Sequence, residues 1–179
     1  DEHETFLHPQ AQDKLISSFE TISESSQVFI TTHSPYLLKK FKNQNHDIKI
    51  FSPQGEKVLS GQNMDLFPFS PTWGEINYFA FDVASVEFHN ELFGYLQESC
   101  SQWSEKEFDN WLSQNEIVRD MPYIRENRGN SSPAIYITLP MYIRNLIHHP
   151  ENRNNVIYTS EQLRNSIDKM VKLVREMEN

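Results

Sequence analysis

A first group of residues has types and a spacing that suit chemistry on a terminal phosphate. Asp1 and Glu2 form an acidic pair, and His33 follows in the run VFITTHSP. An acidic pair that ends a buried strand can hold Mg²⁺ through the aspartate and orient an attacking water through the glutamate, while a histidine ending the next strand can face the same phosphate. We therefore interpret these residues as the second half of an ATP-hydrolysing site.

The sequence pieces DEHE, LHP at residues 7–9 and TTHSP at residues 31–35 occur in this order. Together they resemble the Walker B to switch-histidine region of ABC-type ATPases, the group that includes overcoming-lysogenisation-defect, RecF-like and SMC-like proteins and many bacterial phage-defence ATPases. The resemblance implies that Asp1 binds Mg²⁺, Glu2 is the catalytic base and His33 senses the γ-phosphate of ATP. It also implies a homodimer or higher homo-oligomer, because such ATPases complete each site with a loop from a second subunit.

The phosphate-binding loop of such a site is expected elsewhere. No G-x-x-x-x-G-K-[ST] sequence occurs in the 179 residues, and this loop supplies the backbone N–H groups that surround the phosphates. We therefore expect it upstream of residue 1 or on another chain, and we interpret the sequence as the C-terminal part of a longer ATPase.

A second group lies in the run YIRNLIHHP, residues 142–150, where Arg144 and Asn145 precede His149. This spacing resembles the R-x₄₋₆-H motif of HEPN domains, small four-helix bundles of which many are metal-independent RNases. The chemistry accounts for the residue types. A histidine with a near-neutral pKa can deprotonate a ribose 2′-hydroxyl, and an arginine that stays protonated can stabilise the charge on the phosphate. In this family two chains normally contribute to one site.

Helix geometry separates the two adjacent histidines. In a regular helix Arg144 and His148 lie one turn apart on one face, whereas His149 lies one turn from Asn145. Pro150 disfavours helical backbone for the residue before it, so we expect His149 to leave the helix end, where it could turn toward Arg144. We favour His149 as the base, with His148 as the alternative. A histidine near a helix C-terminus also has a purely structural explanation, since it can interact with the helix dipole.

Composition limits the remaining possibilities. A hydrophobic content of 37% indicates a folded chain, and the single cysteine, Cys100, fits a reducing compartment, so we expect a cytoplasmic protein. No apolar run is long enough to cross a membrane. The net charge of −9 argues against a broad nucleic-acid surface. Residues 119–153 nevertheless contain five arginines, so any contact with phosphate, including that of a possible RNA or DNA partner, is expected there rather than elsewhere.

The pattern of apolar residues predicts an α/β segment, the C-terminal part of a P-loop ATPase sheet, followed by an all-α helical bundle. In the first part we expect helices at 9–22 and 35–40, a buried strand at 27–32 and a hairpin at 48–59. In the second part we expect helices at 76–98, 104–114, 139–148 and 159–177, a mobile loop at 119–133 and a brief strand at 134–138. Ser104 with Glu107, and Thr159 with Gln162, predict capping boxes at the starts of two of these helices. The Pro- and Gly-containing stretch at 60–74 predicts two domains, residues 1–72 and 73–179.

These features lead to one main hypothesis and two alternatives. The main hypothesis is the ATP-hydrolysing subunit of a bacterial anti-phage defence system, with a HEPN-like RNase or its remnant as the helical domain. One alternative is an ATPase without nuclease activity whose helical domain docks a partner nuclease, for example of the HNH type. The other alternative is an ATPase of the DNA-repair type.

Overall fold

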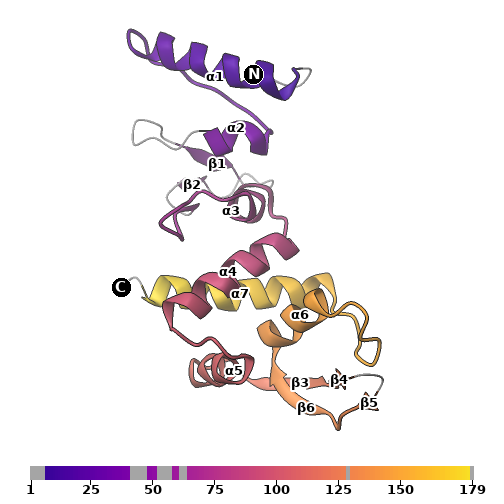
Figure 1. Ribbon diagram of the computed structural model, residues 1–179. Helices are drawn as coiled ribbons and strands as arrows, with labels where there is room; N and C mark the ends of the chain where they lie inside the picture. The colour runs from indigo at the N-terminus through magenta and orange to yellow at the C-terminus, as the bar shows by residue number, and fades with distance from the viewer. Residues whose placement is uncertain (1–6, 41–47, 52–57, 61–63, 128–129, 178–179) are drawn as a thin grey trace. The chain divides into compact units, whose positions relative to one another are not determined.

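The computed structural model describes residues 7–40, 48–51, 58–60, 64–127 and 130–177. The chain divides into two compact units, residues 1–81 and 82–179, which we describe separately (Figure 1). The division falls after Phe81, whereas composition placed the domain boundary after residue 72. The segment Trp73–Phe81 therefore lies within the first unit.

The first unit contains both helices that the sequence predicts. Helix α1 (Pro9–Ser23) begins with proline, which suits a first helical turn, and the His8 side chain accepts a hydrogen bond from the Gln10 backbone N–H. Helix α2 (Pro35–Lys40) also begins with proline. The Tyr36 hydroxyl lies 3.4 Å from both carboxylate oxygens of Asp13, so α2 is tied to α1.

The strand predicted at residues 27–32 is not formed in the structure. The segment has no regular secondary structure, and Phe29 is 85% exposed. The prediction relied on an apolar, β-branched run. A strand, however, requires a neighbour for its N–H and C=O groups, and no described residue forms a ladder with this segment.

The predicted hairpin is confirmed as an antiparallel pair, β1 (Lys49–Phe51) with β2 (Val58–Ser60). The core beneath it consists of Ile50, Met64 and Ile76. The short helix α3 (Trp73–Glu75) continues into a π-helical turn, η2 (Ile76–Ala80). This unit is therefore α/β in content, and its only described sheet has two antiparallel strands.

Buried Glu75 organises the loop before α3. Its carboxylate accepts hydrogen bonds from the backbone N–H groups of Leu66 at 2.9 Å and Thr72 at 2.7 Å, and from the Ser70 hydroxyl. The Thr72 hydroxyl in turn caps the Glu75 N–H. A fully buried carboxylate is tolerated here because several donors surround it.

The long helix predicted at residues 76–98 is interrupted. Helix α4 begins only at Val86 and ends at Ser99, after a non-helical connection. Asp82 has a φ of 58°, which a helix cannot contain, and the Ser85 side chain caps the new helix through the Phe88 N–H. The apolar spacing continued across the interruption, so periodicity alone could not reveal it.

Four helices form most of the second unit. These are α4, α5 (Glu105–Gln114), α6 (Leu139–His148) and α7 (Ser160–Met177). Helices α4, α6 and α7 pack against one another (Figure 1). Their buried side chains include Leu92, Ile143 and Ile167. Both predicted capping boxes are confirmed, at the starts of α5 and α7.

The second unit is not all-α, which corrects the predicted fold class. Strand β3 (Arg119–Tyr123) pairs antiparallel with β6 (Ile135–Thr138), and β4 (Glu126–Asn127) pairs with β5 (Asn130–Ser131). Only the brief strand at 134–138 was expected. The stretch predicted as a mobile loop forms β3, β4 and β5 because its backbone N–H and C=O groups find partners across the pairs.

Candidate functional site

The first predicted site can be followed only in part. Asp1 and Glu2, the expected Mg²⁺ ligand and catalytic base, lie outside the described residues. His33 is described and exposed, one residue before the Ser34 that precedes α2. Two hydrogen bonds of Ser34 fix the backbone that leads into α2. The Ser34 N–H donates to the Thr32 hydroxyl at 2.9 Å, and the Ser34 hydroxyl accepts from the Leu37 N–H at 3.4 Å.

The second predicted site lies on α6 and is well defined. The Nη1 atom of Arg144 donates both to Asn145 Oδ1 at 3.1 Å and to Glu105 Oε1 at 2.9 Å. Asn145 is only 2% exposed, and the guanidinium carbon of Arg144 lies 5.9 Å from the centre of the Phe93 ring. The Arg-Asn pair of the motif thus forms one unit in which the buried amide helps to orient the guanidinium.

Glu105 also holds a second arginine, which sequence reasoning did not place at the site. Its Oε2 accepts a hydrogen bond from Arg125 Nη2 at 2.8 Å, while Oε1 accepts from Arg144. One carboxylate therefore joins α5, α6 and the chain that follows β3. The excess of arginines over residues 119–153 was a signal for this region, but no local pattern connects Glu105 with partners 20 and 39 positions away.

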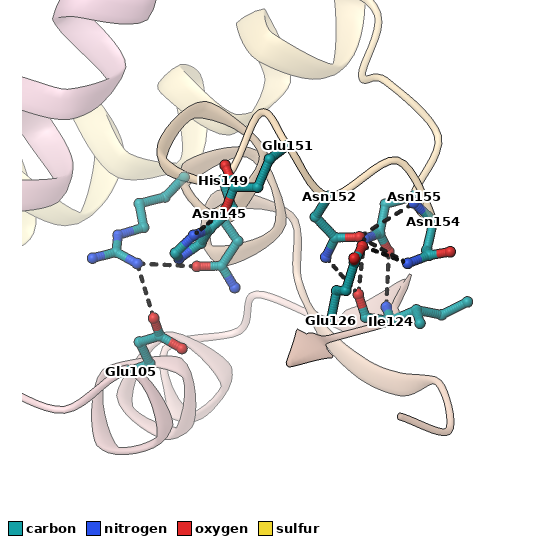
Figure 2. A network of polar contacts seen from close by, with 10 residues as sticks. Glu105, Ile124, Glu126, Asn145, His149, Glu151, Asn152, Asn154 and Asn155 are labelled. Atoms are coloured by element: carbon teal, nitrogen blue, oxygen red, sulfur yellow. Dashed lines mark hydrogen bonds and ion pairs between the residues drawn. The ribbon is translucent and has the colours of Figure 1, made fainter. Parts of the chain in front are cut away.

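The two histidines at the end of α6 differ in their surroundings. Helix α6 ends at His148, and His149 has a φ of −126° and a ψ of 60°, so the expectation that His149 leaves the helix is confirmed. Its backbone N–H still donates to the Asn145 carbonyl at 2.9 Å, whereas its ring Nδ1 lies 3.2 Å from Glu151 Oε1 (Figure 2). The His149 ring thus pairs with Glu151, and the expected turn toward Arg144 stays a prediction.

His148 carries a shifted pKa. Partial burial, followed by the positive charges of Arg144 and His149, lowers the pKa of His148 below its ordinary value. At neutral pH this ring is therefore neutral and able to accept a proton. The shift is consistent with the expected one-turn spacing of Arg144 and His148, and it keeps His148 as an alternative base.

A buried ion pair one helical turn further along α5 supports the site. Asp109 is 6% exposed and accepts hydrogen bonds from Arg119 Nε at 2.7 Å and from the Thr138 backbone N–H at 2.9 Å. Arg119 also donates to the Asn110 side chain. This carboxylate connects α5 with β3 and with the start of α6, so it fixes the helix that carries Arg144 relative to the helix that carries Glu105.

Within the described part of the chain, no cluster of three or more His, Cys, Asp or Glu side chains is arranged to hold a metal ion. The expected Mg²⁺ ligand, Asp1, lies outside that part of the chain. No described helix combines the length and apolar content that crossing a bilayer requires.

Comparison with known proteins bears on the first site. Residues 1–38 match the family model of the AAA ATPase domain. The matched segment contains Asp1, Glu2 and His33, and it extends through α1 into α2. It supports an ATPase fragment at this end of the chain, and nucleotide hydrolysis as its activity. No curated protein and no solved structure matches the chain.

Proposed function

We propose that the protein is the ATP-hydrolysing subunit of a bacterial anti-phage defence system and that its helical unit cleaves RNA as a HEPN-like domain. The observation that supports ATP hydrolysis is the match of residues 1–38 to the AAA ATPase domain, a segment that contains the acidic pair and His33 in the expected order. RNA cleavage is supported by the pairing of Arg144 with buried Asn145, one helical turn before His149.

In the proposed ATPase reaction, Asp1 binds Mg²⁺, Glu2 orients the water and His33 contacts the γ-phosphate. His33 is exposed and lies just before α2, at the position to which the resemblance assigns the γ-phosphate contact. ATP binding and dimerisation would set the arrangement of the helical units in a cytoplasmic homo-oligomer.

In the proposed RNA cleavage, His149 takes the proton of a ribose 2′-hydroxyl, and His148 is the alternative base. The 2′-oxygen then forms a bond to phosphorus, and the bond between phosphorus and the 5′-oxygen breaks. A proton from water completes the 5′-hydroxyl, so the products are a 2′,3′-cyclic phosphate and a 5′-hydroxyl end. Arg144 stabilises the negative charge that develops on the phosphate oxygens.

A second candidate function is favoured by one contact. Arg144 is already paired with Glu105, as a purely structural arginine would be. In that case the helical unit docks a separate nuclease, and the ion pair shapes the docking surface without taking part in cleavage.

ATP hydrolysis is tested with Glu2→Gln in the intact protein. Release of phosphate should fall by at least about 100-fold, because the water loses its orienting base, while ATP binding persists. Glu4→Gln is the matched control and should hydrolyse ATP at the wild-type rate. Equal activity of Glu2→Gln and Glu4→Gln would contradict the assignment of the acidic pair.

RNA cleavage is tested with Arg144→Ala and His149→Ala, with Arg153→Ala as a control from the same region. If cleavage or cell toxicity disappears in the first two variants while partner binding and thermal unfolding are retained, the RNase assignment stands. If only the binding of a partner nuclease changes, the helical unit is a docking module and the RNase assignment is wrong.

A further inference from the structure

We propose that Arg144 and Arg125 form a binding site for one phosphodiester group of RNA, and that Glu105 blocks this site until the phosphate displaces it. The inference rests on the proposed RNase function, since it names how that same site binds its substrate. It adds Arg125 as a second phosphate-binding residue and Glu105 as an internal competitor.

The geometry around Glu105 is that of an occupied anion site. Its two oxygens accept one hydrogen bond each, from Arg144 Nη1 at 2.9 Å and Arg125 Nη2 at 2.8 Å. A carboxylate and a phosphodiester both present two oxygens that share a negative charge, and the planar guanidinium group binds either one. The two arginines therefore converge on a point where a phosphate can replace the carboxylate.

Arg125 is held in position by its own backbone and by that of its neighbour. The Arg125 N–H donates to the Ser132 hydroxyl at 3.1 Å, and the Arg125 carbonyl accepts from the Ser132 N–H at 2.8 Å. The Ile124 carbonyl accepts from the side-chain amides of Asn152 at 2.8 Å and Asn155 at 2.9 Å. The Ile124 N–H donates to Asn155 Oδ1 at 2.8 Å (Figure 2).

These contacts explain the asparagine-rich sequence between α6 and α7. Asn152 is buried, and Asn152 and Asn155 both bond to the residue just before Arg125 (Figure 2). The connection after α6 thus fixes the end of β3, and with it the base of the Arg125 side chain. We treat Asn152 and Asn155 as positioning residues for Arg125.

Arg144 is oriented from the other side. Asn145 accepts one of its hydrogen bonds, and the Phe93 ring lies beside its guanidinium carbon. Phe93 is itself fixed against Phe108 by an edge-to-face contact with ring centres 4.7 Å apart. Both arginines are therefore oriented before any ligand binds, which lowers the ordering cost of binding a phosphate.

The cluster is open to solvent. The side chains of Arg144, Arg125 and Glu105 are 26%, 54% and 38% exposed. Ion pairs at such exposures contribute little to stability, because water and salt compete with them. A phosphate in solution can therefore reach both arginines and exchange with the carboxylate at little cost to the fold.

The experiment measures RNA binding by fluorescence anisotropy with a labelled single-stranded RNA, in full chains that also carry His149→Ala to prevent cleavage. Replacing Glu105 by Gln removes the competing charge, so we expect binding to become about five- to tenfold tighter. Adding Arg125→Ala to Glu105→Gln should abolish that gain. Glu126→Gln is the matched control, because it removes the same charge next to Arg125 but contacts Asn154 and no arginine in the described structure.

Competition with inorganic phosphate shows whether the site binds an RNA phosphodiester or free phosphate. If RNA displaces the probe at far lower concentration than phosphate, and the difference depends on Arg125, the site recognises an RNA phosphodiester. If phosphate competes as well as RNA per phosphate group, the site binds free phosphate and the proposal is wrong. The proposal is also wrong if Glu105→Gln increases the affinity for RNA no more than Glu126→Gln does. It is equally wrong if the increase persists when Arg125→Ala is added to Glu105→Gln.

A parallel cleavage assay, in chains that retain His149, keeps the two proposals distinguishable. Cleavage that requires Arg144 but is unchanged by Glu105→Gln and Arg125→Ala would leave the RNase function standing and overturn this inference. An Arg125-dependent gain in RNA binding without any cleavage would support this inference and contradict the RNase function.

Discussion

Two carboxylates one helical turn apart in α5, Glu105 and Asp109, each bind arginine, and they differ in what surrounds them. Asp109 is buried, and its partners, Arg119 and the Thr138 N–H, belong to the fold of the second unit. Glu105, one helical turn earlier, is partly exposed and joins Arg144 and Arg125. A carboxylate–arginine ion pair therefore has two different roles in this helix. The role depends on how deeply the carboxylate is buried and on which other groups donate hydrogen bonds to it.

Burial decides what each carboxylate can do. Removing one partner of a buried ion pair leaves an uncompensated charge or an unpaired backbone group, which costs several kcal/mol. An exposed pair can open, since water solvates both partners. We therefore expect substitutions around Asp109 to change stability and substitutions around Glu105 to change binding.

The largest effect is expected on the rate of RNA cleavage, when a variant of Arg144 is compared with a variant of Arg119. Arg144→Ala should reduce RNA cleavage about 100- to 1,000-fold, because the charge on the phosphate loses a fixed cation. Arg119→Ala should cleave within about threefold of wild type at a temperature where it is folded, because its partners lie in the fold. The comparison would break if Arg119→Ala lost cleavage while remaining folded, or if Arg144→Ala kept it.

The next effect concerns stability and arises at buried Asp109. Asp109→Ala should lower the free energy of unfolding by about 3 kcal/mol, because Arg119 and the Thr138 N–H both lose their partner. Urea denaturation followed by circular dichroism measures this loss. A change below about 1 kcal/mol would show that the buried pair is not structural.

A second buried polar contact predicts a dependence of stability on pH. His89 is fully buried, its Nε2 lies 3.0 Å from the Ser166 hydroxyl, and burial lowers the pKa of His89 to about 4, against an opposing contact with Asn90. The unfolded chain therefore binds a proton near its ordinary pKa, before the folded chain does, so acid favours unfolding. We expect stability to fall by about 2 kcal/mol between about pH 6.5 and about pH 4.5.

The contribution of His89 is isolated by comparing this pH profile with that of His89→Gln. The variant should lose that part of the slope, whatever its stability at neutral pH, because glutamine does not titrate. His89→Asn is a second variant if the first does not fold. Parallel profiles for wild type and variant would contradict the assignment.

The smallest effect on stability is expected at Glu105. Glu105→Gln should change the free energy of unfolding by less than about 1 kcal/mol, because its ion pairs are accessible to water. Urea denaturation of Glu105→Gln and Asp109→Asn in one buffer gives the comparison directly. A loss of stability at Glu105 as large as that at Asp109 would remove the distinction between the two carboxylates.

The sequence predicted local features of the fold well. The capping boxes at Ser104 and Thr159 need only residues three positions apart, and the apolar face of α7 needs only regular spacing. The strand predicted at 27–32 is not formed, because strand formation depends on a neighbouring strand and not on composition alone. The prediction of a mobile loop at 119–133 was wrong for the converse reason. Its backbone is ordered by partners that lie elsewhere in the sequence.

The candidate site was predicted in the same uneven way. Arg144, Asn145 and His149 lie on one short segment, so their types and spacing could be recognised together. Glu105 and Arg125 could not be placed, because their contacts depend on how α5, α6 and the end of β3 meet. Long-range contacts of this kind require the fold.

The most direct test of the whole account is an assay that follows ATP hydrolysis and RNA cleavage in the intact protein at once. We predict that wild type does both, that Glu2→Gln loses ATP hydrolysis, and that Arg144→Ala loses RNA cleavage while it still hydrolyses ATP. RNA cleavage that continues at the wild-type rate in Arg144→Ala, or ATP hydrolysis that continues in Glu2→Gln, would contradict the account.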